Sequence, residues 1–466
     1  MPDEILAFTL SLLPIREAAR TSILSSRWRY LWKDSVALSS ALNLDVLEMR
    51  GSDYPENFFG TYENWRFTEK RWLVSDERLK FVDWVDRILT LHSARVLDSF
   101  RIRYYFRKKK FARLIDEWLR IATTKKVKNY DINLSHFSSW GDPSPPDKEL
   151  YKFPNRLFTQ ETVLLIRSMS LNSCGFKPLD SNLFTSLLEL QLEHVFIGQA
   201  NFVTFLSNCP NLEKLYLTRC YKIHKLDIRG SLPKLKHLAL SNCRGLLRVK
   251  IDARNLISFI FEGGQATFRF RNVPKLSSVI VFHDTNSFST MLRKFSSHIP
   301  KLESLMLQLT LVRENIIPTR FLNLKKLELM INSFQIGQAL WSYIPIIQSS
   351  PNLLKLEMNW CYCVGLACDP FVEPKPFDPP HRFLEEVKLT GFTGTDHEID
   401  VARYLITNTN ALRMITVDCQ LLMYSFKDGY FDFRGYTEEP DRNKIMKANQ
   451  QLMNVVPSGA QLQFII

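Results

Sequence analysis

Three cysteines that lie close together in the chain, Cys361, Cys363 and Cys368, have the type and spacing to be considered as metal ligands. Structural zinc needs four ligands in a tetrahedron, and its cysteines usually come as C-x-x-C pairs. One C-x-C pair and one further cysteine supply only three sulfur atoms, and the nine histidines are scattered along the chain, with no pair at metal-ligand spacing. The sequence therefore predicts no metal and no other cofactor, and the 8 cysteines are expected to be free thiols.

The residue patterns of common catalytic sites are also missing from the sequence. His397-Glu398 lacks the second histidine of a zinc-protease helix. There is no G-x-S-x-G motif and no phosphate-binding glycine loop. Glycine accounts for only 16 of 466 residues, about half of the usual ~7%. We therefore expect a protein that acts by binding and has no catalytic site of its own.

The densest concentration of charge lies in residues 101–128 and could bind an anionic partner. Eleven basic residues against Asp116 and Glu117 give this segment a net charge of +9, out of +13 for the whole chain. Apolar residues from Phe111 to Ile121 recur at helical spacing, which predicts a helix with one buried and one basic side. The basic residues are Arg101, Arg103, Arg107, Lys108, Lys109, Lys110, Arg113, Arg120, Lys125, Lys126 and Lys128.

This basic segment has several interpretations. Its charges could be solvated on the outer side of the helix, they could dock an acidic target, or they could bind nucleic acid or an anionic small molecule such as an inositol phosphate. A short Lys/Arg run could also act as a nuclear signal. Nucleic acid is the less favoured partner, because the aromatic residues of the segment lie on its buried side, where no base could stack on them.

The first element of the chain, residues 1–45, is expected to contain three short helices. Pro2-Asp3-Glu4 is typical of a helix start. Pro14 ends the first helix and Ile15 opens the second, and Ser25 or Ser26 could cap the third. Helices this short cannot bury the two tryptophans and many leucines that they carry. Part of this apolar surface must therefore meet the rest of the chain or a partner.

The motifs of this segment resemble an F-box of the type found in plant F-box/LRR/FBD proteins. The match consists of Pro2-Asp3-Glu4-Ile5-Leu6, Ser11-Leu12-Leu13-Pro14 and Arg27-Trp28-Arg29-x-Leu31-Trp32, in that order. The resemblance implies docking on a Skp-type adaptor, and through it a cullin–RING ubiquitin ligase, in the nucleus and/or cytoplasm. The positions that it assigns to the adaptor interface are Pro2, Ile5, Leu6, Leu10, Leu13, Pro14, Leu24, Trp28, Leu31 and Trp32.

Two alternatives stay open for this segment. Several of the ten positions could form the core of the small domain itself rather than an interface. In addition, Met1 stands where the family has a leucine. This departure suggests an alternative function, a non-catalytic leucine-rich-repeat scaffold whose truncated F-box no longer binds the adaptor.

A leucine-rich pattern (apolar, two residues, apolar, one residue, apolar) occurs nine times between residues 166 and 358, with weaker copies at 97–102 and 127–132. Successive units begin 20 to 29 residues apart, which is the period of leucine-rich repeats that stack into a curved parallel sheet. Such repeats turn an Asn or Cys inward after the strand. The cysteines at that position are Cys174, Cys220, Cys243 and Cys361.

A second, offset pattern predicts extended chain on the outer side of the array over part of its length. Apolar residues recur at strand-like spacing at 223–228, 246–251 and 267–270, midway between the main strands. Elsewhere the outer side is expected to be helical, for example at 202–206 and 290–295.

The concave face of the predicted sheet carries a candidate surface for the unknown target protein. Residues between the buried apolar positions of each strand point to the opposite side, into solvent on the concave face, as in any strand. One column of these residues is apolar from Tyr216 to Met306. An exposed apolar stripe of this kind favours protein binding. Its candidate residues are Tyr216, Ile260, Ile280, Phe282 and Met306. The alternative is that these side chains pack against their neighbours along the sheet or lie under a loop.

The C-terminal segment is expected to form a strand, a helix and a strand, at 383–392, 396–407 and 412–417, with a last strand within 458–465. This order resembles the FBD module of the same plant family. No apolar run approaches the ~18 residues of a membrane span, so no membrane partner is expected.

Together these patterns predict an α/β protein in four parts. A three-helix F-box occupies residues 1–45, and linker helices with irregular first repeats follow at 46–152. A leucine-rich-repeat solenoid with a parallel curved sheet spans 153–379, and an α+β FBD-like cap spans 380–466. The function implied by the resemblance is the substrate-recognition subunit of an SCF-type ubiquitin ligase.

Overall fold

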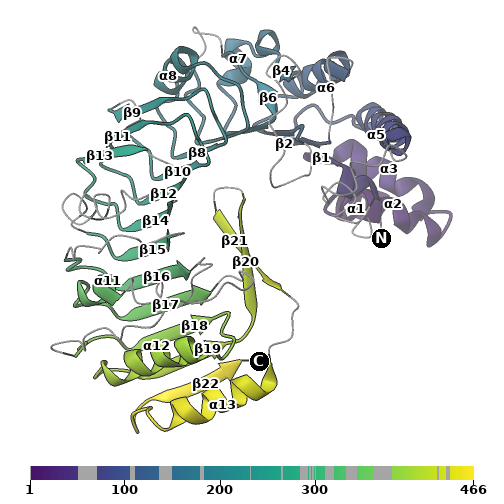
Figure 1. The fold of residues 1–466 in the computed structure, drawn as a ribbon. Coiled ribbons are helices and arrows are strands. Elements are labelled where there is room, and N and C mark those ends of the chain that lie inside the picture. Colours follow the sequence, from purple (N-terminus) through teal and green to yellow (C-terminus); the bar gives the residue numbers. More distant parts are fainter. Residues whose placement is uncertain are drawn as a thin grey trace. The chain divides into compact units, whose positions relative to one another are not determined.

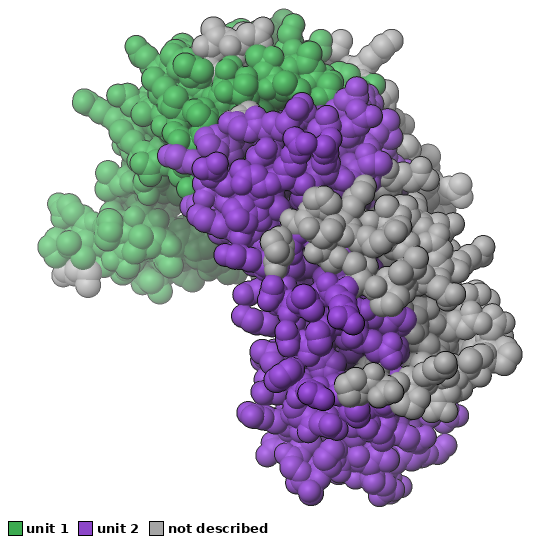
Figure 2. Space-filling model, turned by 90° about the vertical axis from the view of Figure 1, so that its left-hand side faces the viewer, with its two compact units in different colours: residues 1–223 green, residues 224–466 purple. Residues whose placement is uncertain are grey.

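A computed structural model describes the fold (Figure 1), and the described part of the chain forms two compact units, residues 1–223 and 224–466 (Figure 2). The described residues are 2–50, 71–104, 111–135, 150–178, 183–230, 232–263, 266–283, 292, 295, 299, 301–309, 320–331, 344–360, 380–427, 430–436 and 441–465.

Three short helices open unit 1, as the sequence predicts. They are α1 (Asp3–Ser11), α2 (Ile15–Arg20) and α3 (Trp28–Leu38), with the 3-10 turn η1 (Thr21–Ile23) between the last two. One small apolar cluster holds them together, because no single helix of this length can bury its own apolar side. The cluster consists of Leu6, Leu10, Ala18 and Leu31, with the partly buried rings of Trp28 and Trp32 packed against it.

Prolines mark two of the three helix starts. Pro2 and Pro14 are the N-caps of α1 and α2, and both have the extended backbone that precedes a helix. The predicted cap of α3 by Ser25 or Ser26 is wrong, because that helix begins after Arg27 and has no side-chain cap. Arg27 instead forms an ion pair of 2.6 Å with Asp3, which joins the start of α3 to the first turn of α1.

Six strands of unit 1 pair in parallel without any shift of register from one to the next. This arrangement confirms the leucine-rich-repeat prediction, including the two weaker copies at 97–102 and 127–132. The first of the six strands, at residues 41–45, was not predicted. The strands are, in sheet order, β1 (Ala41–Asp45), β2 (Ser99–Arg103), β3 (Asn129–Asn133), β5 (Ser168–Asn172), β7 (Glu189–Glu193) and β8 (Lys214–Thr218).

The remaining elements of unit 1 are mostly helices, and α6 and α8 lie where the sequence predicts helices. They are α4 (Val46–Arg50), α5 (Arg71–Leu91), α6 (Ala112–Thr124), η7 (Asn155–Leu157), α7 (Gln160–Val163) and α8 (Gln199–Ser207), with the short pair β4 (Tyr151–Lys152) and β6 (Cys174–Gly175).

The described residues of unit 2 include nine more parallel strands of the same kind. The C-terminal segment supplies the last three, so it extends the sheet strand by strand. The strands are, in order, β10 (His237–Ser241), β12 (Ser258–Gly263), β14 (Ser278–His283), β15 (Ser304–Leu309), β16 (Lys326–Ile331), β17 (Lys355–Trp360), β18 (Glu386–Thr390), β19 (Met414–Asp418) and β22 (Gln461–Ile465).

The helices of unit 2 are α11 (Ile344–Gln348), α12 (Asp396–Thr407) and α13 (Arg442–Met453) among the described residues. The order β18–α12–β19 confirms the strand, helix and strand predicted for the C-terminal segment. Helix α13 and the antiparallel hairpin of β20 (Leu421–Lys427) and β21 (Tyr430–Tyr436) were not predicted. The hairpin lies beside β17, on the inner side of the unit 2 sheet (Figure 1).

A second parallel sheet lies on the outer side of unit 2, as the offset apolar pattern predicts. Its strands β9 (Lys225–Arg229), β11 (Arg248–Asp252) and β13 (Thr267–Arg271) pair in the order β13–β11–β9. Edge-to-face phenylalanine contacts join this outer sheet to the inner one, with ring centroids of Phe259 and Phe268 5.6 Å apart and those of Phe259 and Phe270 5.5 Å apart. The core of this region is therefore a layer of aromatic rings between two sheets.

The cysteines of the repeats are buried, as predicted. Cys174, Cys220 and Cys243 are free thiols with little or no exposure, and burial raises the pKa of the Cys174 thiol to about 12. Cys361, Cys363 and Cys368 lie outside the described residues, as does most of the helix predicted at 290–295. In the described part of the chain, no group of three or more potential metal ligands comes together.

Several strands are followed at once by a residue in the left-handed backbone conformation. Such a residue turns the chain sharply away from the sheet at the end of the strand. At five of the seven positions named below it is not glycine, although glycine adopts this conformation at no steric cost. The positions are Ser173, His194, Arg219, Asn242 and Asn272, with φ between 45° and 58°, and Gly230 and Gly391, with φ of 73° and 76°.

Gly391 is needed for a second reason, which gives a test of the strand-end geometry. A Cβ at this position would overlap the carbonyl oxygen of Trp360, whereas a Cβ on Gly230 would meet nothing within 4 Å. We expect Gly230→Ala to lower the free energy of unfolding by roughly 1–2 kcal/mol, because alanine disfavours the left-handed conformation. Gly391→Ala should lower it by at least about 3 kcal/mol, since the backbone around Trp360 must also move. Urea unfolding of both variants measures the difference, and equal losses would contradict the overlap.

Candidate partner-binding surfaces

The three N-terminal helices expose an unusual number of large apolar side chains. Ile5, Leu13 and Leu24, three of the predicted adaptor-binding residues, are 52%, 44% and 64% exposed. Pro2 and Pro14 are exposed as well. Large apolar groups gathered on a small domain mark a surface that is normally covered by a partner.

The other five predicted adaptor-binding residues belong to the interior of the small domain. Leu6, Leu10 and Leu31 are between 2% and 7% exposed, and Trp28 and Trp32 pack against them with partly buried rings. For these positions the structure supports the alternative that they form the core. Their role at an adaptor interface stays a prediction.

Sequence reasoning missed the most exposed apolar residues of this segment. Ile5, Phe8 and Leu12 of the α1 region lie three and four residues apart and therefore share one side of the helix, away from the buried Leu6 and Leu10. The spacing of Phe8 and Leu12 was the available signal, but neither is among the ten positions that the resemblance assigns to the adaptor interface. The exposed residues not predicted are Phe8 (63%), Leu12 (72%), Ile23 (86%), Tyr30 (62%) and Leu38 (59%).

The apolar stripe on the concave face is largely buried. Ile260, Phe282 and Met306 of unit 2 are 4–7% exposed, and Tyr216 of unit 1 is 3% exposed. Phe282 and Met306 form a cluster with the buried Met330, against which the half-buried Ile280 packs. The expectation of an exposed stripe is therefore wrong, because strands only ~4.8 Å apart let large neighbouring side chains cover one another. Whether these residues bind a target stays a prediction.

Beyond the apolar stripe, the same face becomes charged. Lys326 on β16 lies between two carboxylates, 3.3 Å from Glu328 and 3.1 Å from Glu357. The amide Nδ2 of Asn359 donates to Glu328 at 3.1 Å. Burial raises the pKa of the Glu328 carboxyl, and the charge of Glu357 raises it further. The concave surface of unit 2 thus changes from largely buried apolar groups on β12–β15 to paired charges on β16 and β17.

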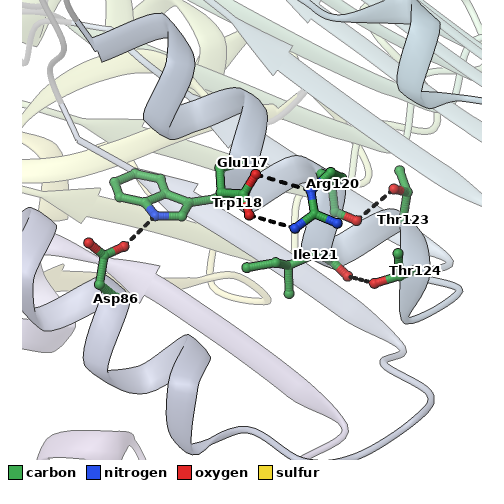
Figure 3. Close-up of polar contacts among 7 residues, drawn as sticks. All are labelled: Asp86, Glu117, Trp118, Arg120, Ile121, Thr123 and Thr124. Atoms are coloured by element: carbon green, nitrogen blue, oxygen red, sulfur yellow. Dashed lines mark hydrogen bonds and ion pairs between the residues drawn. The ribbon is translucent and has the colours of Figure 1, made fainter.

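The predicted amphipathic helix of the basic segment is α6, and its buried side is held by a polar contact (Figure 3). Trp118 is 1% exposed, and its indole Nε1 donates to the carboxylate of Asp86 on α5 at 2.8 Å. On the exposed side, the Arg120 guanidinium donates two hydrogen bonds to Glu117, of 2.6 and 3.0 Å. The helix is therefore anchored through Trp118, and part of its outer charge is neutralised within the helix.

Most described cations of the basic segment have local partners. Arg101 forms an ion pair with Asp131 at 2.9 Å, and Lys128 forms one with Asp98 at 2.6 Å. The ammonium of Lys125 donates to two backbone carbonyls, and burial lowers its pKa. Arg107 and Lys108 to Lys110 lie outside the described residues. These contacts favour the interpretation of a solvated, internally paired surface over that of an anion-binding site.

Comparison with known proteins agrees with this architecture. A model of the F-box domain matches residues 1–37, and a model described as "At1g61320/AtMIF1, LRR domain" matches residues 88–458, well over half of the chain. The chain belongs to the F-box/LRR-repeat family. The resemblance noted from the sequence and the predicted fold class are thereby confirmed.

Three relatives from Arabidopsis thaliana cover nearly the whole F-box/LRR-repeat chain. It is similar to "F-box/FBD/LRR-repeat protein At1g13570", with 24% identity over 93% of this chain and 92% of the relative. It is 25% identical to "F-box/LRR-repeat protein 13", over 90% of this chain and 88% of the relative. It is also 25% identical to "FBD-associated F-box protein At5g56370", over 90% of both chains. Among the described residues, no helix is long and apolar enough to cross a membrane.

The charged part of the concave face leads to a prediction about pH. A carboxyl whose pKa is higher in the folded than in the unfolded chain binds more protons when folded, so stability falls as the pH rises through that interval. Replacing Glu328 with Gln removes this penalty. We expect Glu328→Gln to be more stable than wild type at pH 7 in urea unfolding, with the gain shrinking towards pH 4.

Glu303 offers a matched control for this prediction. Its ion pair with Lys325, of 3.1 Å, lies at the surface, with both side chains more than half exposed. Glu303→Gln is therefore expected to change stability by less than about 1 kcal/mol, with little dependence on pH. A Glu328→Gln variant that loses stability at pH 7 would show that its ion pair with Lys326 outweighs the cost of burial.

Proposed function

We propose that this F-box/LRR-repeat protein is a substrate-recognition subunit of an SCF-type ubiquitin ligase. In this proposal the helices at the N-terminus dock a Skp-type adaptor, which links the chain to a cullin–RING ligase, and the concave face of the repeat array binds a target protein. The place of action is the nucleus and/or the cytoplasm. The observation that carries the proposal is the set of exposed apolar side chains on α1, η1 and α3 of a family-matched F-box.

The energetics of this surface support a role in docking. Eight large apolar residues, from Ile5 to Leu38, are 44–86% exposed on the three short helices and the turns between them. Each one is worth roughly 1.5–3 kcal/mol when it is fully buried. The internal cluster around Leu10 and Leu31 fixes the helices, so the exposed side chains are presented on a preformed surface. A preformed surface loses less conformational freedom on binding than a flexible one.

The proposal assigns no bond-making or bond-breaking step to this chain. A receptor of this kind acts by holding its target near a ligase, which raises the effective concentration of the target there. The repeat array suits that task, since a parallel sheet built from identical rungs is a rigid support for side chains on its inner face.

Charge introduced into the exposed apolar surface tests adaptor binding. We expect Leu13→Asp and Leu24→Asp to lower the amount of a Skp-type adaptor that co-purifies with the full chain by about tenfold or more, because a carboxylate would be buried without a partner at the interface. Both side chains are exposed in the free protein, so the variants should keep the wild-type thermal stability.

Leu188 and Leu247 are matched controls, 41% and 61% exposed and outside the three helices. Leu188→Asp and Leu247→Asp should leave the adaptor bound. Equal adaptor yield with Leu13→Asp, Leu24→Asp and wild type would exclude this surface as the interface. No adaptor with wild type either would favour the scaffold function, in which the F-box does not bind it.

A further inference from the structure

The outer sheet of unit 2 presents a regular face of alternating side chains. Strands β9, β11 and β13 pair residue for residue, with Lys225, Arg248 and Thr267 in one row. In each strand the second and fourth residues are buried and the other three point outward. The aromatic layer beneath fixes the strands against the inner sheet. Nine side chains therefore stand in three rows on this face. Figure 1 shows the three strands that carry them.

The charges on this outer face are strongly unequal. Six of the nine outward residues are basic and two are acidic, which gives a net charge of +4. The rows are Lys225, Arg248 and Thr267; Asp227, Lys250 and Arg269; and Arg229, Asp252 and Arg271. Five of these side chains line a shallow hollow in the surface: Arg229, Lys250, Asp252, Arg269 and Arg271. Four of the six cations are arginines, whose planar forks bind carboxylates and phosphates in pairs of hydrogen bonds.

Only part of this positive charge is neutralised within the sheet. Asp227 pairs with Arg229 at 2.5 Å and with Lys250 at 4.0 Å, and the hydrogen bond from Arg229 lowers its pKa. Within the part of the chain that the structure describes, Arg248, Arg269 and Arg271 form no ion pair with any carboxylate. These three exposed arginines keep their full hydrogen-bonding capacity for a partner.

We propose that the outer face of β9, β11 and β13 is a docking surface for an extended acidic segment of a partner protein. Outward side chains repeat about every 6.8 Å along a strand, and strands lie about 4.8 Å apart. An extended peptide with an acidic residue at every second position repeats at the same interval, so successive carboxylates can meet Arg269 and Arg271. This surface is separate from the F-box helices and does not depend on adaptor binding.

The form of the surface favours a peptide over nucleic acid. None of the nine outward residues is aromatic, so the face has no platform on which unpaired bases could stack. The face also contains two carboxylates, those of Asp227 and Asp252, which would repel the phosphates of a nucleic-acid backbone.

Charge removal on the full-length protein tests the proposal. The probe is a fluorescent ten-residue peptide with glutamate at every second position, and binding is followed by anisotropy at low and at physiological salt. We expect peptide binding to be about tenfold weaker than in wild type for the triple variant Arg248→Ser, Arg269→Ser and Arg271→Ser. Each lost ion pair with the peptide contributes only a modest part of the binding free energy. Added salt should weaken wild-type binding, because exposed charges are screened.

A matched control separates this site from a general effect of net charge. Lys152, Lys177 and Arg442 are exposed cations away from the outer sheet, and their triple replacement by Ser removes the same charge. This control should bind like wild type, and both variants should keep the wild-type melting temperature. Equal peptide binding by the two triple variants would overturn the proposal. So would a duplex DNA probe that binds more tightly than the peptide and is lost in the outer-sheet variant.

Discussion

The structure depends on one constraint: a single repeat cannot bury its own apolar side chains. Each strand of five or six residues points two or three apolar side chains into the core. These side chains are shielded from water only when the preceding and following strands pack beside it. The in-register pairs Leu171–Leu192 and Leu192–Leu217 show how this requirement is met. The regular stacking of the strands follows from this requirement.

The same constraint explains why so much of the fold could be predicted from the sequence. The leucine pattern repeats because the burial requirement repeats, and the offset pattern at 223–270 likewise revealed the outer sheet. Strand β1 was missed, since its two leucines, Leu42 and Leu44, directly follow the F-box motif and have no earlier repeat to align with. The hairpin of β20 and β21 was missed because it pairs with itself and follows no repeat.

Surface properties were harder to predict than the core. A pattern shows which side of a strand a residue takes, but the exposure of that residue depends on the size of neighbours that are distant in sequence. Ile260 and Met306 face the concave side as expected, yet adjacent side chains bury them. The basic segment gave the opposite result, since Arg101 and Lys128 are paired by Asp131 and Asp98 on nearby strands. The outer sheet has a lower density of charge in the sequence, yet among the described residues its Arg248, Arg269 and Arg271 form no ion pair.

The unshifted register of the strands has a consequence for how such a chain can change its length during evolution. Residue-for-residue pairing, such as Leu327 with Leu356 and Leu356 with Val387, makes the rungs interchangeable. A whole repeat can be gained or lost, and the next rung still meets an equivalent edge. A single residue inserted within a rung would exchange its inward and outward side chains. Insertions and deletions should therefore be confined to the connections, where the spacing of 20 to 29 residues already varies.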